Sequence, residues 1–344
     1  MNKFLKRLSF TVALLASPLT INSATASESQ ALDENASYKD AVFSFSGINL
    51  ITLSVADLDK MLGFYKEATG FKLIEQYEVV DEPNFNTLYK EDTLSARIAV
   101  LAAPNTHLRL IEFSKNRGAK TTQKPFYQQG ITHTCYQSPL LSPSYDRFKA
   151  AGAHFLSRGD KPVDLGGYGV TYAYGYDPEG NMFEMEHLAD KYLANAKHDF
   201  KRFPTWMSQV AFASVDRDAL MDFYSLVLGF EPYRKGEYND NPKMDDIVNW
   251  DKVHLKGGWF KIGGSGEVLE VWEFIEPTTE SYERKSTTAL GYSFTIEVKD
   301  LDAEYLRLKE HVEFLGEPIL LFGYYRVLAR DIDGNVFEMR ERRL

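Results

Sequence analysis

Apolar and polar positions along the chain predict short strands that alternate with amphipathic helices in two similar halves. In the first half, an apolar run precedes a helix that ends at Gly70, where glycine suits the left-handed conformation that stops a helix. A second helix is expected near residues 145–151. The strand-like runs of this half are residues 48–55, 96–102, 107–113, 131–137, 170–176 and 182–187. This order of elements predicts two consecutive βαβββ modules.

The second half repeats the pattern. Its first helix is expected to end at Gly229, and its second helix is expected at residues 301–311. The strand-like runs are residues 210–215, 253–262, 267–274, 292–298, 324–329 and 336–340. We therefore predict an α+β fold built as a tandem duplication of paired βαβββ modules, without settling whether modules pair within or across the copies.

Two short motifs establish the repeat. A Phe-Tyr pair occurs at residues 64–65 and again at 223–224. The phrases DPEGNMFEMEH, at 177–187, and DIDGNVFEMRE, at 331–341, close the two halves. Gly and Asn tolerate positive φ, so the Asp-x-x-Gly-Asn segment predicts the turn of a hairpin. Each phrase then places a glutamate at the same position of a final strand.

The first 26 residues have the character of a secretory signal peptide: a basic start, an apolar run at 8–21, and small residues at 24–26. We expect a periplasmic or secreted protein that begins near Ser27; the alternative is an N-terminal membrane anchor. No later run reaches the ~18 apolar residues of a spanning helix, so no stable membrane insertion is expected. The remaining predicted segments are an extension at 27–45, a first domain at 46–188, a linker at 189–206 and a second domain at 207–344.

Composition excludes some classes of partner. Loss of the signal would remove three basic residues and change the net charge from −10 to −13. No basic cluster is large enough for a nucleic-acid partner, so a small-molecule substrate or ligand is expected. Cys135 is the single cysteine, so an intrachain disulfide is excluded and stability must come from core burial.

Three features resemble the vicinal oxygen chelate superfamily of glyoxalase, bleomycin-resistance and extradiol-dioxygenase proteins: the Val-x-Asp-Leu…Phe-Tyr…Gly-Phe run at 55–71, its partner at 215–230, and the two Asp-x-x-Gly-Asn-x-Phe-Glu hairpins. The resemblance covers residues 46–342. It implies that two βαβββ modules curl into an open β-barrel-like domain whose concave face holds a divalent metal ion. It also implies that the ligands come from the first and last strands of each module.

Carried onto the first half, the resemblance implies a metal site made by Glu112, His133 and Glu184, with the two carboxylates also serving as catalytic groups. Leu50 stands at the fourth ligand position. Tyr172, Tyr174 and Leu50 are candidate substrate-binding residues, although tyrosines in a strand more often pack a sheet.

In the second half, an alignment of Ser54 with Ser214 keeps the carboxylates Glu273 and Glu338. Val210 and Ser293 then stand at the other two ligand positions. We interpret the two glutamates as remnants that pair with Arg or Lys, because no histidine joins them.

The chemistry of the residues agrees with a metal site in the first half. Alternation places Met182, Glu184 and Glu186 on one face of their strand. Glu112 shares a face with two leucines, where an ionised carboxylate is costly unless it is paired or coordinating. One imidazole and two carboxylates suit Zn, Fe, Mn, Ni or Co. The alternatives are a hydrogen-bonded structural histidine at His133 and an inert buried thiol at Cys135.

Two functions follow. The first is an exported, metal-dependent lyase, isomerase or dioxygenase that acts on a small oxygen-bearing, potentially aromatic substrate. Extradiol ring cleavage is the weaker version, because the upstream and second ligand histidines of that group are missing. The second is a metal-free protein that binds or sequesters a small molecule, as bleomycin-resistance proteins do.

Overall fold

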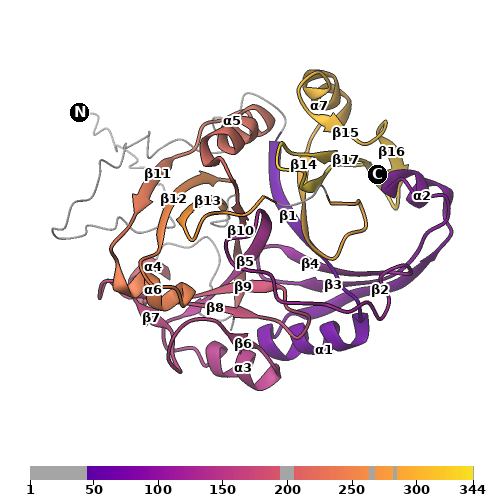
Figure 1. The fold of residues 1–344 in the computed structure, drawn as a ribbon. Helices are drawn as coiled ribbons and strands as arrows, with labels where there is room; N and C mark the ends of the chain where they lie inside the picture. The colour runs from indigo at the N-terminus through magenta and orange to yellow at the C-terminus, as the bar shows by residue number, and fades with distance from the viewer. Residues whose placement is uncertain (1–44, 194–204, 263–267, 282–284, 344) are drawn as a thin grey trace, which may run out of the picture.

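The computed structural model describes residues 45–193, 205–262, 268–281 and 285–343. The signal peptide expected at 1–26 and most of the linker expected at 189–206 lie outside this part of the chain. The described residues form two nine-stranded sheets with helices packed against them, which confirms the α+β class (Figure 1). No helix in the described ranges is long and apolar enough to cross a membrane.

The elements fall into four modules. Module 1 contains β1 (Phe45–Ser54), α1 (Leu58–Thr69), β2 (Lys72–Val80), α2 (Pro83–Tyr89), β3 (Ser95–Ala102) and β4 (His107–Phe113). Module 2 contains β5 (Gly130–Pro139), α3 (Ser144–Ala151), β6 (His154–Phe155), β7 (Val163–Asp164), β8 (Val170–Tyr176) and β9 (Met182–Leu188), and is followed by α4 (Asp190–Leu193). Module 3 contains β10 (Trp206–Ala213), α5 (Arg217–Leu228), β11 (Arg234–Tyr238), α6 (Pro242–Val248), β12 (His254–Lys261) and β13 (Val268–Glu276). Module 4 contains β14 (Gly291–Val298), α7 (Leu301–Leu308), β15 (Glu313–Phe314), β16 (Ile319–Leu321), β17 (Tyr324–Arg330) and β18 (Val336–Arg342).

The modules pair across the two copies. Modules 1 and 4 form one sheet through antiparallel pairing of β1 with β14, and modules 2 and 3 form the other through β5 and β10. We call them the 1/4 sheet and the 2/3 sheet. In Figure 1 the indigo and yellow ends of the chain therefore lie together, beside a unit made from the middle of the chain. The first and last strands of the modules are the central strands of both sheets.

Local sequence determines where the main helices begin and end. Asp57 accepts a hydrogen bond from the backbone N–H of Lys60 at the start of α1, and Gly70 ends this helix with φ 76°. Asp216 and Gly229 occupy the same positions around α5. The equivalent caps show that modules 1 and 3 are copies at the level of local structure.

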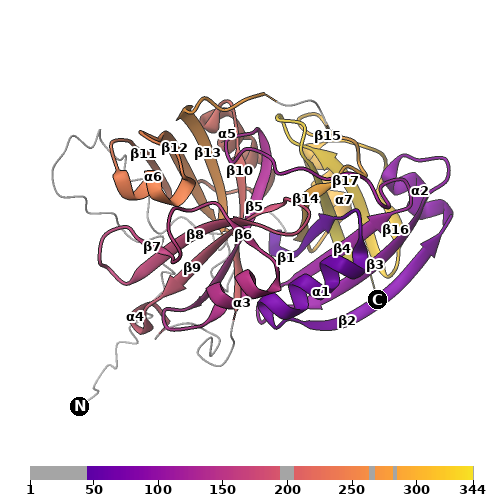
Figure 2. The same cartoon turned by 60° about the horizontal axis from the view of Figure 1, so that its bottom comes forward.

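Helix packing joins different modules from those that the sheets join. Phe64 of α1 meets Phe148 of α3 edge-on, with ring centroids 6.0 Å apart, and the two helices lie side by side in Figure 2. Arg307 of α7 donates to the carbonyls of Leu226 and Val227 at the end of α5, at 2.7 and 2.9 Å. One apolar core continues between these helices and both sheets. Each module is thus bonded to one neighbour by strands and packed against another by its helix.

The repeated hairpin phrase strengthens the second kind of contact. Tyr65 of module 1 donates its hydroxyl proton to Asp177 in the turn of module 2, at 2.8 Å. Tyr224 of module 3 does the same to Asp331 of module 4, at 2.9 Å. Glu179 in the first turn also accepts two backbone N–H groups at the start of α1, both at 2.8 Å. The Phe-Tyr pair and the Asp-x-x-Gly-Asn turn, far apart in the sequence, are two sides of one buried contact.

Candidate metal site

Four adjacent strands at the centre of the 2/3 sheet, β13, β10, β5 and β9, place four ligand-type side chains on one concave face. Cys135 of β5 pairs in register with Gln209 of β10 and with Glu184 of β9. His133 of β5 and Glu270 of β13 lie opposite the same residue of β10. Cross-strand partners project to the same side of a sheet, so these side chains converge.

A bulge in β5 places His133 and Ile131, two residues apart, on opposite faces of the sheet. Phe212 of β10 pairs with Ile131, but the preceding Ala211 pairs with His133, which leaves Thr132 as an extra residue. A bulge interrupts the alternation and re-aims the next side chain. Ile131 accordingly belongs to the apolar core between helices and sheets, whereas His133 faces the concave side.

The four side chains lie close enough to share one ion. Nε2 of His133 lies 3.6 Å from Oε2 of Glu184 and 3.7 Å from Oε2 of Glu270. One potential ligand atom from each of these three residues lies within 4.8 Å of the others. Gln209 donates a hydrogen bond to Glu184 and approaches Oε2 of Glu270 at 3.4 Å. A 180° rotation of this amide presents its oxygen to the same centre.

Burial sets the protonation of these groups. It lowers the pKa of His133 to about 4, an effect that the nearby Glu270 offsets in part. Burial raises the pKa of Glu184 to about 8. Burial, together with repulsion from Glu184, also raises the pKa of Glu270 to about 8. The imidazole of His133 is therefore neutral, as a metal ligand must be. In the described part of the chain no nearby cationic side chain keeps Glu184 and Glu270 ionised near pH 7, and a bound metal ion would supply that positive charge.

One buried atom supports a cation at this point. Nδ1 of His133 lies 2.9 Å from the hydroxyl of Thr132, but Nε2, which points between the two carboxylates, has no hydrogen-bond partner among the described residues. A buried polar atom without a partner costs free energy. A divalent cation would satisfy this nitrogen and compensate both carboxylates, so the residues present fit a metal ion.

A small pocket opens from the site. It has a volume of about 100 Å³ and is lined by 13 apolar or aromatic side chains, among them Tyr172 and Tyr174. Helix α6 covers one side through Met244, Ile247 and Val248. The structure therefore places the two predicted tyrosines on a pocket wall beside the site, and their role in substrate binding stays a prediction.

Cys135 lies next to the same carboxylates. Its thiol is fully buried, and its sulfur, Glu184 and Glu186 form a second close group. Burial, followed by repulsion from Glu186 and Glu184, raises the pKa of the thiol well above its ordinary value. The thiol is protonated at neutral pH and is a poor metal ligand in that form.

Glu112 does not join this site, and its predicted role as a metal ligand is wrong. It lies on β4 in the 1/4 sheet, where it accepts the backbone N–H of Leu58 at 2.8 Å and pairs with Arg117 at 2.5 Å and Arg97 at 3.5 Å. The leucines with which it shares a strand face belong to the core on the helix side. Alternation therefore turns Glu112 away from the concave face and toward the start of α1.

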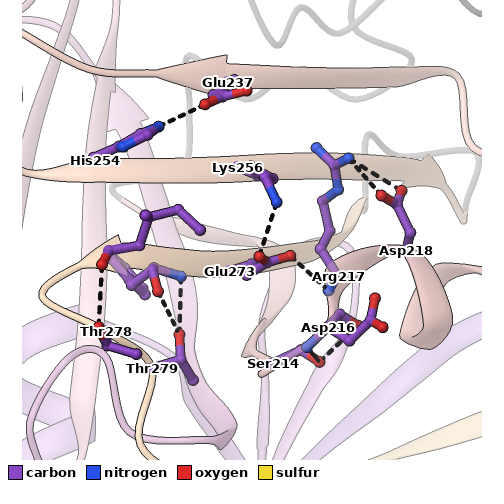
Figure 3. Close-up of polar contacts among 12 residues, drawn as sticks. Ser214, Asp216, Arg217, Asp218, Glu237, His254, Lys256, Glu273, Thr278 and Thr279 are labelled. Atoms are coloured by element: carbon purple, nitrogen blue, oxygen red, sulfur yellow. Dashed lines mark hydrogen bonds and ion pairs between the residues drawn. The ribbon is translucent and has the colours of Figure 1, made fainter.

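Glu273 is the counterpart of Glu112 in module 3 and has the same structural role. Figure 3 shows that it accepts a hydrogen bond from the backbone N–H of Arg217, at 3.2 Å, and pairs with Lys256 at 2.9 Å. The predicted pairing with a basic side chain is confirmed. The side chain that β13 contributes to the site is Glu270, three residues earlier and on the opposite face.

The other two expectations concern the 1/4 sheet. Glu338 lies 3.1 Å from Arg109 and 3.3 Å from Arg326, so its predicted pairing with basic side chains is confirmed. Leu50 is buried opposite Thr295 in this sheet and does not line the pocket of the 2/3 sheet. Its assignment as a substrate-binding residue beside His133 is therefore wrong.

Sequence reasoning missed Gln209 through a one-residue shift in the alignment, and it missed Glu270 because Glu273, three residues later, was taken as the ligand of that strand. Matching the helix caps Asp57 and Asp216 aligns Leu50 with Gln209, whereas matching the two serines that precede them aligns Leu50 with Val210. The Phe-Tyr pairs have the same spacing as the caps and would have corrected the alignment. Glu270 was detectable as the single charged residue in the run Val-Leu-Glu-Val-Trp at 268–272.

Comparison with known proteins agrees with the fold. The family model of the glyoxalase/bleomycin resistance protein/dioxygenase superfamily matches residues 47–185. Lactoylglutathione lyase GLX1 of Arabidopsis thaliana is 25% identical over 189 residues, which are 54% of this chain and 56% of that protein. The match thus spans little more than half the length of this relative. The crystal structure of glyoxalase I from Zea mays superimposes with a TM-score of 0.57 at 19% identity, over 86% of this chain and 92% of that one.

Proposed function

Because the chain belongs to the glyoxalase/bleomycin resistance/dioxygenase superfamily, we propose that it is a divalent-metal-dependent lyase or isomerase that acts on a small molecule with two adjacent oxygen atoms. The observation that supports this proposal is the buried Nε2 of His133, which has no hydrogen-bond partner among the described residues and lies beside the carboxylates of Glu184 and Glu270. Gln209 contacts the same two carboxylates. The name of the Arabidopsis relative points to the same reaction class.

His133, Glu184, Gln209 and Glu270 would hold the ion, and a bound divalent ion would polarise the substrate oxygens and stabilise negative charge on them. The two carboxylates differ in their support. The indole N–H of Trp259 donates to Oε1 of Glu270 at 2.6 Å and fixes that side chain. Glu184 accepts its hydrogen bond from Gln209, itself a member of the site.

This difference supports Glu184 as the group that transfers the proton. Its carboxylate would remove a proton from the hydroxyl-bearing carbon next to a substrate carbonyl and return it to the carbonyl carbon, while the hydroxyl proton moves to the former carbonyl oxygen. The reaction is therefore an isomerisation that needs no co-reactant. The raised pKa of Glu184, caused by burial, suits a group that gains and loses a proton near neutral pH. The aromatic walls around it would keep water from the reacting carbons.

We also propose export of the protein, on the basic, apolar and small-residue pattern of residues 1–26. N-terminal sequencing of the periplasmic or secreted fraction tests this. A start near Ser27 supports export, and intact Met1 on cytosolic protein contradicts it.

Titration of chelator-treated protein with Zn, Mn, Ni, Co and Fe(II) tests the metal site. We expect one ion per chain, and loss of that binding in Glu270→Gln but not in Glu273→Gln, its matched control on the other face of the same strand. If wild-type protein binds none of these ions at micromolar concentration, the metal-dependent function is wrong. The metal-free binding function then becomes the better account of the pocket.

A further inference from the structure

A second cavity lies between the segments that connect the modules. It has a volume of about 420 Å³ and is lined by residues from 116–132, 179–182 and 285–292. The backbone N–H of Gln129 donates to the carbonyl of Glu280 at 3.0 Å, so the two connecting segments hold each other. The cavity shares no described lining residue with the pocket beside His133. Pockets of roughly 300–1,000 Å³ enclose small molecules, so this cavity has room for one.

The lining of this cavity carries positive charge. Its described residues include three lysines, Lys120, Lys124 and Lys285, and one carboxylate, Glu179. The two oxygens of Glu179 each accept a backbone N–H group at the start of α1, at 2.8 Å, and the positive end of that helix compensates the carboxylate. The cavity therefore favours an anion.

Two of the lysines are a feature that both copies repeat. Lys124 stands six residues before Gly130, the first residue of β5. Lys285 stands six residues before Gly291, the first residue of β14. Nζ of Lys285 lies 3.0 Å from the point where a Cβ of Gly130 would stand, and Nζ of Lys124 lies 3.8 Å from the same point at Gly291. Each lysine thus reaches the glycine of the other copy, and the two like charges meet in one cavity.

Lys285 is the lysine that can contact a ligand directly. Arg330 donates to its carbonyl, and its side chain is partly buried. Its ammonium group makes no hydrogen bond or salt bridge with any residue that the structure describes. Burial, followed by repulsion from Lys124, lowers the pKa of this group to about 8, and Asp331 offsets part of the effect. The group is therefore charged at pH 7, where a bound anion would replace the water that burial removes.

The other lining groups suit a phosphate ester. Thr121, Thr122 and Ser286 line the cavity, and their hydroxyls have no hydrogen-bond partner in the described ranges. A phosphomonoester carries a charge of about −1.5 to −2 and three strong acceptor oxygens, which match two neighbouring ammonium charges and several hydroxyl donors. A lysine binds phosphate as a point charge. The volume exceeds that of a bare phosphate, and the polar lining suits a body rich in hydroxyls.

We propose that this cavity binds a small phosphomonoester with a hydroxyl-rich body, and that the phosphate lies against the ammonium group of Lys285. Lys124 contributes its charge, and a hydrogen bond from it is not required. This site is separate from the candidate metal site and does not depend on the metal-dependent function.

Four matched probes test this inference. Glucose 6-phosphate, glucuronate and glucose have the same ring with a dianion, a single charge or no charge at carbon 6, and inorganic phosphate has the dianion without the ring. We expect glucose 6-phosphate to bind roughly 10- to 100-fold more tightly than glucose, as hydrogen bonds to a charged group contribute, and more tightly than the other two. Isothermal titration calorimetry measures the affinities on the full chain freed of divalent ions, because phosphate also binds metal ions.

Variants locate the binding site. Lys285→Met should lower the affinity for glucose 6-phosphate by roughly 10- to 100-fold. Thr122→Val removes one hydroxyl donor and should cause a smaller loss. Lys299→Met is the matched control, because Lys299 is an exposed lysine between β14 and α7 that does not line the cavity. It should keep the wild-type affinity.

Four outcomes overturn the inference. The first two are equal affinities of wild-type protein for glucose 6-phosphate and glucose, and an affinity for glucose 6-phosphate that Lys285→Met leaves unchanged. The third is equal binding of glucuronate and glucose 6-phosphate, which would contradict a site for a dianion. The fourth is equal binding of inorganic phosphate, which would show that the rest of the cavity holds nothing. Wild-type affinities decide three of these outcomes, so the inference is testable if the variant does not fold.

Discussion

The two concave faces of the molecule have the same architecture and opposite chemistry. The 2/3 face has a histidine, two glutamates and a glutamine at its four central positions. The residues at the equivalent positions of the 1/4 face are Leu50, Arg109, Ser293 and Glu338. The repeated hairpin phrase supplies a glutamate to both faces, Glu184 in one and Glu338 in the other.

These two glutamates show that neighbours, not position, determine the behaviour of a side chain. Burial raises the pKa of Glu184 to about 8. Burial also acts on Glu338, but the charges of Arg326, Arg109 and Arg340 overcome it and lower the pKa of that carboxyl to about 2. On the 2/3 face no cationic side chain among the described residues compensates the charge of Glu184. On the 1/4 face the guanidinium groups of Arg109 and Arg326 compensate the charge of Glu338.

The space above the faces differs in the same way. Phe85, Leu88 and Tyr89 of α2 pack into an apolar cluster over the 1/4 sheet. The equivalent α6 has the slimmer Met244 and Ile247 at the wall of a pocket. The 1/4 face thus has a cavity of about 30 Å³ beside Tyr89 and Ser293 and a glutamate that is paired with arginines, whereas the 2/3 face has a pocket of about 100 Å³ beside an unsatisfied histidine.

The largest expected effect compares Glu338→Gln with Glu184→Gln in metal-free protein at pH 9. Glu338→Gln leaves Arg109 and Arg326 buried without their carboxylate and should lower the free energy of unfolding by about 3–5 kcal/mol. Glu184→Gln removes a buried charge beside Glu270 and should not lower it. Urea unfolding monitored by fluorescence measures both, and equal losses in the two variants would show that the faces do not differ as described.

Replacement of His133 should abolish most metal binding. His133→Ala removes the one imidazole of the site, and we expect divalent-metal affinity to fall at least roughly 100-fold, the upper end of losses seen for outer-shell partners. Ser293→Ala, at the equivalent position of the 1/4 sheet, should leave affinity unchanged. Competition with a fluorescent chelator measures the metal affinity of each variant. A loss of metal affinity in Ser293→Ala would show that the ion binds to the 1/4 face.

Metal affinity should depend on pH through the carboxylates. The pKa values of Glu184 and Glu270 are raised to about 8, so each must lose a proton before it binds the ion. Affinity should therefore rise by roughly tenfold per pH unit for each proton displaced below pH 8, and level off above it. His133, with a pKa of about 4, is already neutral in this range. An affinity that changes only between pH 5 and 7 would contradict this assignment.

A smaller effect is expected at the residue that supports Glu270. Trp259→Phe removes the N–H that donates to this carboxylate and should weaken metal binding by roughly tenfold. Trp206→Phe is the control, because its buried indole donates at 2.8 Å to Gln137 and not to a site carboxylate. If both variants lose affinity equally, the effect is one of packing.

The last comparison predicts no change in metal affinity and tests whether the modules pair across the two copies. Leu50→His should not change metal affinity, because Leu50 lies in the 1/4 sheet and cannot reach His133. Glu112→Gln should also leave the metal in place. A calorimetric titration in which Leu50→His tightens binding would mean that the first two modules share a site after all.

The fold was predictable because its repeats are local. Alternating strands, helix caps and hairpin turns all depend on residues close together in the sequence, and each was found within a few residues of its place. The polar strand β2 and the helices α2 and α6 were not predicted. Strand β2 lies at a sheet edge, where most of its side chains are exposed and no apolar alternation is required.

The site was half predictable. His133 and Glu184 were found, because one module supplies both. Gln209 and Glu270 come from another module, and the pairing of β5 with β10 depends on contacts that no local pattern specifies. Glu270 and Glu273 differ by three positions in one strand, so choosing the wrong one moved the carboxylate to the opposite face of the sheet.

The cross-copy pairing of strands has a consequence for symmetry. Two identical half-chains could complete both sheets as a homodimer, but a two-fold axis would then force the same residues onto both concave faces. Each half-chain alone would also expose two unpaired strand edges, which invite association or aggregation. In the single chain, β1 meets β14 and β5 meets β10 without a search for a partner, and no axis ties the two faces together. The residues of one concave face can therefore differ from those of the other, as the arginines around Glu338 and the imidazole beside Glu184 do.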